Sequence, residues 1–353
     1  MTPSPAIVRR RTLGASLGLG DALFASNEEK SFARAIEAGL DKVEEGLTAQ
    51  LSFADDIADA AGRYLLDAGG KRVRPVLALL TAQLGDGAND DVVVAAQAVE
   101  ITHVASLYHD DVMDDAQVRR GVPSAQTVWG NSVAILTGDL LFARASKLIA
   151  GLGERALTIQ ADVFERLCLG QLHETIGPQH GQDPIEHYLG VLADKTGSLI
   201  SCAALVGVIF SNAPDEYREP VTQFGEKVGV AFQLVDDVID LSAAIEQTGK
   251  AAGTDLRAGV PTLPLLYLRR EAETDAGAAA LLARLDEGLA PGADAEIFAQ
   301  AVAELREHPV TAATLAEAHR WADEAVAALA PLPEGPVKKS LSRFAQAIVE
   351  RSG

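Results

Sequence analysis

The chain has 353 residues, of which 48% are apolar, 23% are charged and 5% are aromatic. These proportions, with 15 prolines and 31 glycines, exclude collagen-like and low-complexity classes. A mean hydropathy of +0.11 favours a large buried core over a disordered chain. The 50 acidic residues outnumber the 30 basic ones and give a net charge of −20, which disfavours nucleic-acid binding. An anionic substrate would therefore need a local basic cluster or a metal bridge.

Two cysteines, Cys168 and Cys202, lie in apolar helical patterns, which predicts two buried free thiols. Free thiols favour a reducing compartment, here the cytoplasm, over a disulfide framework. Arginines at 9–11 precede a mildly apolar stretch, but glycines and Asp21 interrupt it and no convincing cleavage site follows. We therefore expect residues 1–20 to be a flexible lead-in rather than an export signal.

Apolar residues recur at three- and four-residue intervals along most of the chain, as in amphipathic helices. The first such face consists of Ile36, Leu40, Val43 and Leu47. Further helices are expected, in chain order, over 92–115, 133–149, 163–176, 185–210, 221–241, 262–270 and 311–329, with a last helix ending near Ile348.

No stretch alternates convincingly with the period of two that marks a strand, and the β-like run 92–94 has helix-favouring neighbours. The breaks are too short for domain linkers, and the Ala- and Gly-rich segment 276–294 is expected to join peripheral helices. The most apolar stretch, 199–210, is too short to span a bilayer, so no transmembrane segment is predicted. We predict one all-α domain over residues 1–353.

A first acidic motif, HDDVMDD at 109–115, ends a predicted apolar helix. On a helix, Asp110 and Asp114 lie one turn apart, and Asp111 and Asp115 form the neighbouring pair. These carboxylates repel one another, and the C-terminal end of a helix disfavours negative charge. A solvated acidic helix end is one interpretation. A cation would relieve both penalties, and paired oxygen ligands suit Mg²⁺, with Mn²⁺ as an alternative.

A second acidic motif, FQLVDDVID at 232–240, repeats this pattern. Asp236 and Asp240 are spaced one turn apart at the end of another apolar helix, with Asp237 between them. One such motif alone would be compatible with chance, whereas two with the same spacing favour a function. Opposed across a helical bundle, the two motifs would line a cleft able to hold divalent ions.

Two short basic clusters stand out in this acidic chain. The first is GGKRVRP at 69–75, where paired glycines allow the backbone to approach an anion and Lys71 and Arg74 supply donors. The second, Arg119 and Arg120, closely follows the first acidic motif. In isolation each would be an ordinary surface charge cluster, but beside metal-type carboxylates they indicate phosphate sites.

Three further patterns are weaker signals of function. Lys195 and Thr196 open the most apolar helix, and Lys250 follows the second acidic motif; each alone is more often structural. Glu100 and His103 match the Glu-x-x-His motif of di-iron bundles. That architecture needs two such motifs with further glutamates, and this chain has one convincing candidate, so we reject it.

Together the motifs resemble the trans-isoprenyl diphosphate synthases, also called polyprenyl synthetases. GGKRVRP, HDDVMDDAQVRRG, DKTG, FQLVDDVID and GKAAGTDL occur in the family's order between Gly69 and Pro264. The resemblance implies antiparallel helices around a central cavity, the isoprenoid synthase fold, usually as a homodimer. It also implies the reaction: an allylic diphosphate ionises, the double bond of isopentenyl diphosphate attacks the carbocation, and a proton is lost.

The resemblance also implies roles for individual residues. The principal magnesium ligands would be Asp110, Asp114 and Asp236, with Asp111, Asp237 and Asp240 acting through waters or hydrogen bonds to these ligands. The allylic diphosphate would be bound by Arg119, Lys195 and Lys250, and isopentenyl diphosphate by Lys71, Arg74, His103 and Arg120. Thr196 and Gln233 would flank the reacting carbons. The residues expected to carry catalysis are Asp110, Asp111, Asp114, Arg119, Lys195 and Asp236.

One position departs from the family pattern, because Val260 stands where the family often has a lysine. Product length can be argued from Ala105 and Ser106, which precede Asp110 by about one helical turn. In the family, bulky aromatic residues here stop growth at short products. Two small residues therefore predict a long all-trans chain, suited to a quinone side chain.

Rival functions remain open at this point. Farnesyl or geranylgeranyl diphosphate synthesis would need a shorter product cavity. A class I terpene cyclase normally lacks the second Asp-Asp-x-x-Asp motif and the basic clamp that contains Lys71 and Arg74. A non-catalytic subunit of a two-component synthase tends to lose the aspartates that this chain keeps. The expected partners are the two diphosphate substrates, a second copy of the chain and, at product release, the membrane surface.

Overall fold

The structure is a computed structural model that describes residues 27–242, 252–290 and 292–352. Over these residues nearly all regular structure is helical, which confirms the predicted all-α class. The strands in this part of the chain are β1 (Val118–Arg119) and β2 (Val122–Pro123), which pair antiparallel. This hairpin was not predicted, because two-residue strands are too short to show an alternating pattern.

The chain divides into two compact units. Unit 1 comprises residues 1–165, 199–225 and 328–344, and unit 2 comprises residues 166–198, 226–327 and 345–353. Three helices contribute several residues to both units: α8 (Glu154–Ile176), α11 (Arg218–Asp240) and α18 (Pro336–Val349). Two more, α10 (Ser198–Phe210) and α17 (Pro309–Ala328), each have one terminal residue in the other unit. The single domain expected from the sequence stays a prediction.

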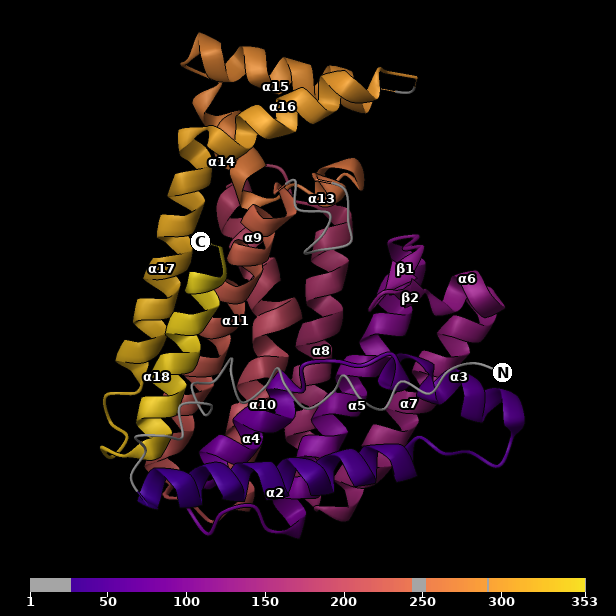
Figure 1. Cartoon of the computed structure of the whole chain (residues 1–353), viewed down its shortest axis with the longest axis vertical. Coiled ribbons are helices and arrows are strands. Elements are labelled where there is room, and N and C mark those ends of the chain that lie inside the picture. The colour runs from indigo at the N-terminus through magenta and orange to yellow at the C-terminus, as the bar shows by residue number, and fades with distance from the viewer. Residues whose placement is uncertain (1–26, 243–251, 291, 353) are drawn as a thin grey trace. The chain divides into compact units, whose positions relative to one another are not determined.

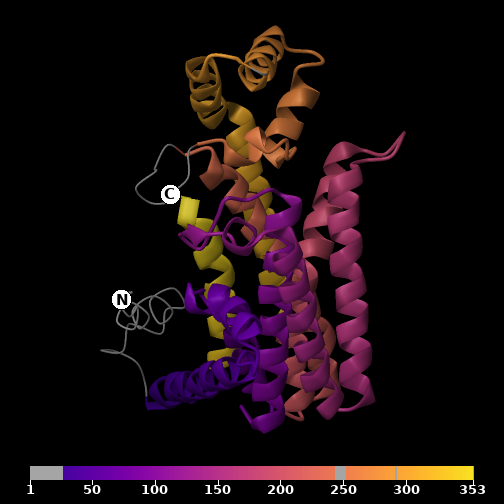
Figure 2. The same cartoon turned by 90° about the vertical axis from the view of Figure 1, so that its right-hand side faces the viewer.

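Unit 1 is built around α5. Its helices include α2 (Asn27–Gln50), α3 (Asp56–Asp67), α4 (Val73–Ala82), α5 (Asp90–Met113), α6 (Ala125–Trp129), α7 (Asn131–Gly151) and most of α10 (Ser198–Phe210), followed by the short 3₁₀ turn η2 (Asp215–Tyr217). Helices α5 and α7 run side by side, and α2 lies across α4 and α5 (Figures 1 and 2).

The composition of α5 explains its central place. Asn89 caps its first turn by accepting a 2.9 Å hydrogen bond from the backbone N–H of Val92. Residues on all sides of the helix are then buried, among them Ile101, Val104 and Tyr108. A helix that is apolar all round belongs inside a domain, so α5 carries its terminal carboxylates out of the core of unit 1.

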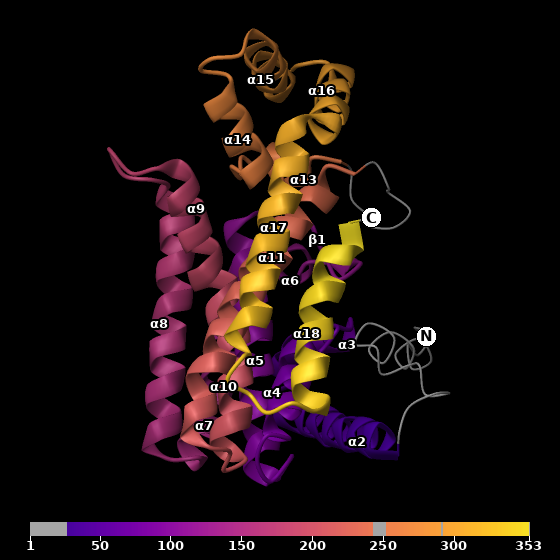
Figure 3. The same cartoon turned by 90° about the vertical axis from the view of Figure 1, so that its left-hand side faces the viewer.

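Unit 2 contains α9 (Pro184–Leu192), the π-helical turn η1 (Ala193–Gly197), α13 (Thr254–Arg257), α14 (Leu263–Glu271), α15 (Ala276–Leu289), α16 (Ala295–Glu307), nearly all of α17 (Pro309–Ala328) and the terminal turn η3 (Glu350–Ser352). Helices α15 and α16 pack against each other (Figures 1 and 3). Their shared core is centred on Phe298 and includes Leu281 and Leu285. The segment 276–294, which was expected to join peripheral helices, is itself mostly helical, and these leucines give α15 a buried face.

Both cysteines are free, but only Cys202 is buried, so the prediction of two buried thiols was wrong for Cys168. Cys168 lies on α8 near Phe164 and Leu172, whose side chains are also exposed. Helical spacing of apolar residues identified the helix but not which of its faces meets the core.

Within the described residues, one helical stretch, Pro184–Phe210, is long and apolar enough to cross a membrane by length and composition. Of its most apolar window, 67% is buried inside the protein. A core helix passes the same test of length and composition, so this stretch carries little weight as a membrane span. Its burial agrees with the core helix expected from the sequence.

Candidate active site

The first acidic motif lies at the C-terminal end of α5, in unit 1. The helix ends at Met113, and the backbone N–H of Asp114 donates to the carbonyl of Asp110 at 2.8 Å. Asp115 has a φ of 48°, in the left-handed region, so the chain has already left the helix there. The predicted helical pairing of Asp111 with Asp115 is therefore wrong, whereas Asp110 and Asp114 keep the spacing of one turn.

Asp111 is the buried member of this motif, with an exposed fraction of 0%. The hairpin β1–β2 turns through Arg120 and Gly121, which both have positive φ angles, as a two-residue hairpin turn requires. This reversal lets Arg119 Nε donate to Asp111 Oδ1 at 2.6 Å. Burial raises the pKa of Asp111, and Arg119 opposes this shift.

The basic loop before α4 is arranged around a buried ion pair. Gly69 and Gly70 have φ angles of 112° and 144°, which only glycine adopts readily. Arg72 follows them and is buried; its Nε contacts Glu44 at 2.6 Å and its Nη1 contacts Glu100 at 3.4 Å. The sequence pattern gave no signal for the role of Arg72, because its acidic partners lie 28 residues away in the chain.

Four arginines lie close enough to His103, on α5, to act on its charge. We name these five side chains the basic pocket: Arg72, Arg74, His103, Arg119 and Arg120. Burial and these four arginines together hold the pKa of His103 well below its usual value. Burial also lowers the pKa of Arg74 to about 10, with Glu100 opposing and Arg120 adding to the shift.

Several of these groups already have protein partners. Arg120 Nη1 donates to the carbonyl of Leu65 at 2.6 Å and also to the carbonyl of Gly69. Arg74 Nε, in contrast, is buried without a hydrogen-bond partner in the described part of the chain. Lys71 is exposed at the edge of this loop. A buried donor atom without an acceptor is costly unless a further group completes its contacts, and an oxygen of an anion would do so. The basic pocket therefore has the chemistry of a phosphate site.

The basic pocket and the first acidic motif share one helix. His103 and Asp110 are seven residues apart on α5, which places them on the same face about 10 Å apart along the axis. Unit 1 thus brings together Arg74, His103, Arg119 and Arg120 with the carboxylates at the end of α5.

In unit 2, Lys195 lies in the π-helical turn η1, with its Nζ 2.5 Å from Glu174 Oε2. Glycines allow this turn to pack closely: a side chain at Gly170 would meet the backbone of Lys195, and one at Gly229 would meet the backbone of Gly197. Single π-helical turns are frequent at functional sites. Thr196 follows Lys195 in this turn, and Gln233 lies half-buried on α11.

A second ion-pair group that the sequence did not reveal supports η1. Arg166 contacts Asp194 at 2.9 Å and Glu226 at 2.8 Å. Asp194 precedes Lys195 directly, so this network fixes the backbone that carries the lysine.

The three aspartates of the second acidic motif have different surroundings. Asp236 Oδ1 lies 3.5 Å from Arg351 Nη2, and the Arg351 guanidinium stacks 4.9 Å from the centre of the Phe232 ring. Asp237 is buried, accepts from the Tyr188 hydroxyl, and burial raises its pKa to about 8 against the opposing hydrogen bonds. Asp240 Oδ2 accepts from the backbone N–H of Asp255 at 3.0 Å.

Two further predicted positions follow this motif in the chain, Lys250 and Val260. Lys250 lies outside the described residues. Val260, at the position of the family lysine, lines a pocket of about 410 Å³ in unit 2 together with Glu174 and Tyr188. The apolar side chain of Val260 therefore lines a cavity within unit 2.

Across the described residues, no group of three or more His, Cys, Asp and Glu side chains is arranged to hold a metal ion. Mg²⁺ is usually held by one or two carboxylates together with substrate phosphates and waters, and does not need such a cage. Asp111 Oδ2 is buried and has no hydrogen-bond partner among these residues, which leaves it able to accept a bond from a metal-bound water. The hard carboxylate oxygens at the end of α5, in unit 1, therefore have the chemistry of a magnesium site.

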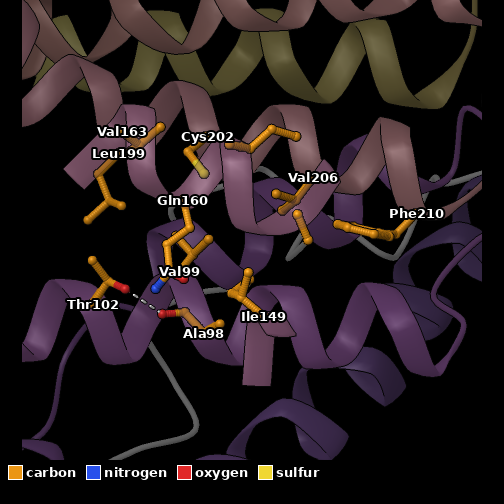
Figure 4. A pocket seen from close by; sticks show the side chains of 12 residues that line it. Ala98, Val99, Thr102, Ile149, Gln160, Val163, Leu199, Cys202, Val206 and Phe210 are labelled. Carbon is orange, nitrogen blue, oxygen red and sulfur yellow. Dashed lines mark hydrogen bonds between the residues drawn. The ribbon is translucent and has the colours of Figure 1, made fainter. Parts of the chain in front are cut away.

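The predicted chain-length residues are both buried in unit 1. Ala105 is fully buried, and the Ser106 hydroxyl donates to the carbonyl of His103 at 2.9 Å. Further along α5 lies a small, mostly apolar pocket of about 20 Å³ lined by Ala98, Thr102 and residues of α7, α8 and α10 (Figure 4). Phe210 packs against one side of this pocket.

Comparisons with known proteins agree with this picture. A family model described as polyprenyl synthetase matches residues 55–296. The nonaprenyl diphosphate synthase of Mycobacterium tuberculosis is 43% identical over 343 residues, covering 97% of this chain and 98% of that protein. The crystal structure of a polyprenyl synthase from Caulobacter crescentus, complexed with calcium and isoprenyl diphosphate, has a TM-score of 0.83 at 32% identity and covers 91% of this chain and 97% of its own. A geranylgeranyl pyrophosphate synthase from Corynebacterium glutamicum, with the same ligands, has a TM-score of 0.79 at 40% identity, covering 93% and 99% of the two chains.

Proposed function

The chain belongs to the polyprenyl synthetase family, and from this membership we infer that it is a transferase that elongates an allylic diphosphate with successive isopentenyl diphosphate units. The observation that carries this function is the basic pocket of unit 1, which shares α5 with the first acidic motif. His103 of this pocket lies about 10 Å along α5 from the metal-type carboxylates, so unit 1 offers an anion site and a metal-type site close to each other.

We propose that isopentenyl diphosphate binds to Arg74, His103 and Arg120 of the basic pocket and to Lys71 in the loop beside them. The unpartnered Arg74 Nε supports this role, because a diphosphate oxygen would satisfy it. The bonds of Arg120 to the carbonyls of Leu65 and Gly69 orient its guanidinium and so reduce the entropy that binding must remove.

We propose that the allylic diphosphate binds between cationic and carboxylate groups, with Arg119, Lys195 and Lys250 as its direct cationic partners. Asp110, Asp114 and Asp236 would hold Mg²⁺, with Mn²⁺ as a substitute, and Asp111, Asp237 and Asp240 would support them. Bound Mg²⁺ would neutralise the charge that the leaving diphosphate develops. The Caulobacter crescentus structure, a complex with calcium and isoprenyl diphosphate, supports a divalent ion in the family.

The proposed reaction balances without a protein nucleophile. The C–O bond of the allylic diphosphate breaks and the diphosphate leaves with the electron pair. The π electrons of isopentenyl diphosphate form the new C–C bond, and the proton then lost passes to the released diphosphate. The protein residues bind, orient and exclude water, with Thr196 and Gln233 beside the reacting carbons, because water would quench the carbocation.

We propose a long all-trans product that serves as a quinone side chain. Ala105 and Ser106 offer no bulk against a growing tail, and the Ser106 hydroxyl is satisfied within its own helix. A tail that follows α5 beyond these residues reaches the pocket beside Ala98. The name of the Mycobacterium tuberculosis relative, a nonaprenyl diphosphate synthase, also favours a long product over a geranylgeranyl one.

We propose a homodimer that uses the exposed apolar face of α8. Phe164, Cys168 and Leu172 recur every four residues on this helix and are exposed in the single chain. Iodoacetamide labelling of Cys168 should therefore slow as the protein concentration rises through dimer formation. Labelling at a constant rate across a concentration range that shows dimers by light scattering would place the interface elsewhere.

We propose that the enzyme works in the cytoplasm and touches the membrane surface only when it releases its apolar product.

The direct test of the function uses the purified chain with Mg²⁺, farnesyl diphosphate and labelled isopentenyl diphosphate. Elongated linear products support the proposal. A cyclic product would favour a terpene cyclase, and inactivity of the pure chain would favour a non-catalytic subunit.

A further inference from the structure

We propose that Tyr188 is a positioning residue for the second acidic motif, which it fixes through Asp237 to the start of α14. The inference rests on the proposed function, because its consequence concerns how Asp236 is presented to the metal–diphosphate group. All the residues that carry it belong to unit 2.

The contact joins three helices. The Tyr188 hydroxyl, on α9, reaches both oxygens of the Asp237 carboxylate on α11, at 2.8 and 3.0 Å. The backbone N–H of Leu263, the first residue of α14, donates to Asp237 Oδ2 at 3.1 Å. Tyr188 and Asp237 are 6% and 5% exposed, so water competes little for these bonds.

This arrangement turns Asp237 inward. Its carboxylate accepts from a side chain and a backbone group of unit 2, whereas Asp236, the preceding residue, lies beside Arg351. Successive side chains on a helix point about 100° apart, so fixing Asp237 fixes the rotation of the last turn of α11 and thereby the direction of Asp236. Without such an anchor the last turn of a helix tends to fray.

Asp240, three residues after Asp237 and on the same face of α11, completes the anchor. Its carboxylate accepts from the backbone N–H of Asp255, and its carbonyl accepts from the N–H of Gly253 at 2.8 Å. Two of the three aspartates in the motif therefore hold the segment that contains α13 and leads to α14. Tyr188 is the side-chain donor to Asp237. Without its hydroxyl, the buried Asp237 carboxylate would depend on the backbone N–H of Leu263 alone.

The decisive variant is Tyr188→Phe, which removes one hydroxyl and keeps the ring. We expect the Mn²⁺ concentration for half-saturation, followed by electron paramagnetic resonance in the presence of inorganic diphosphate, to rise about tenfold, the factor expected for loss of one hydrogen bond to a charged group. In kinetics, KM for the allylic diphosphate should rise while KM for isopentenyl diphosphate stays unchanged, because the basic pocket belongs to unit 1.

Tyr267→Phe is the matched control. Tyr267 is a half-buried tyrosine of α14 whose ring lies under Arg270 and packs against the core of unit 2, and no aspartate of the acidic motif is among the contacts of its hydroxyl in the described residues. The same loss of a hydroxyl there should leave Mn²⁺ binding and both KM values unchanged. Incorporation of p-aminophenylalanine at position 188, which restores a donor, should recover Mn²⁺ binding, and this rescue separates positioning from a general loss of packing.

Equal Mn²⁺ half-saturation in Tyr188→Phe and the unaltered protein overturns the proposal, as does an equal loss in Tyr267→Phe. If Tyr188→Phe unfolds, the protein with p-aminophenylalanine at position 188 provides the test instead. Normal folding of that protein without restored Mn²⁺ binding would also contradict a positioning role. The proposed function fails separately, if the unaltered protein binds Mn²⁺ and diphosphate but does not elongate farnesyl diphosphate.

Discussion

Arg119 Nε donates a 2.6 Å hydrogen bond to the buried Oδ1 of Asp111, eight residues earlier in the chain. This pair links the first acidic motif at the end of α5 to the hairpin β1–β2. It means that a carboxylate in the candidate metal site and a cation in the candidate diphosphate site set each other's positions before any substrate binds.

Because Asp111 is fully buried and Arg119 is 28% exposed, Arg119→Gln leaves a buried carboxylate without its cation. We expect the free energy of unfolding to fall by about 2 kcal/mol, somewhat below the cost of breaking a fully buried pair. Urea denaturation measures this loss. Arg63→Gln, which breaks the exposed pair of Arg63 with Asp67 at 3.7 Å, should cost under about 1 kcal/mol. Similar losses in the two variants would show that Asp111 does not depend on Arg119.

His103 should make stability and ligand binding depend on pH in opposite ways. Its pKa is lowered in the folded protein, so the unfolded chain binds the proton more tightly and stability should fall as the pH drops below about 6.5. His103→Gln should remove this part of the pH dependence in urea denaturation between about pH 7.5 and 5.5.

The arginines of the basic pocket disfavour the protonated form of His103. A bound diphosphate would offset this repulsion and raise the pKa of His103. Isopentenyl diphosphate binding near pH 6 should therefore take up more protons in the unaltered protein than in His103→Gln. Calorimetry in buffers with different ionisation enthalpies measures this difference. Equal proton uptake in both proteins would place the diphosphate away from His103.

Product length should respond to bulk along α5 in order of position. Ala105→Phe and Ser106→Phe place a ring about 6–8 Å from Asp110 along the helix axis, and Ala98→Phe places one about 18 Å away. We expect the first two variants to release shorter products than the third, as resolved by reversed-phase chromatography of the dephosphorylated prenols. Products of unaltered length in Ala105→Phe would show that the tail does not follow α5.

The carboxylate of Asp110 should be needed for turnover but not for folding. Asp110→Ala relieves repulsion at a helix end that disfavours negative charge, so helix content by circular dichroism should remain, while kcat falls by about a hundredfold or more. Asp115→Ala is the control, because Asp115 has left the helix and contacts Gln126 at 3.4 Å. Comparable activity in Asp110→Ala and Asp115→Ala would remove Asp110 from the metal site.

Helical periodicity predicted much of this molecule because its longer helices carry regular apolar faces. It located α5 and α11 and placed the acidic motifs at their ends, and paired glycines at 69 and 70 correctly marked a sharply turned loop. The predicted helix extends to Asp115, beyond the observed end of α5 at Met113, because a run of acidic residues does not indicate where a helix ends.

The contacts that organise the site were beyond sequence reasoning. Tyr188 and Asp237 are 49 residues apart, and Arg72 and Glu100 are 28 apart. Such pairs are set by how helices pack, and nothing in the local sequence marks them. Cys168 illustrates the same point, because an apolar pattern does not distinguish a face that meets the core from one left exposed.

The central claim is that both acidic motifs hold metal ions against one diphosphate. Anomalous diffraction from crystals grown with Mn²⁺ and inorganic diphosphate tests it most directly. We predict manganese peaks coordinated by Asp110 and Asp114 of the first motif and by Asp236 of the second, with diphosphate bridging them. Manganese confined to one motif, or diphosphate bound without manganese, would contradict it.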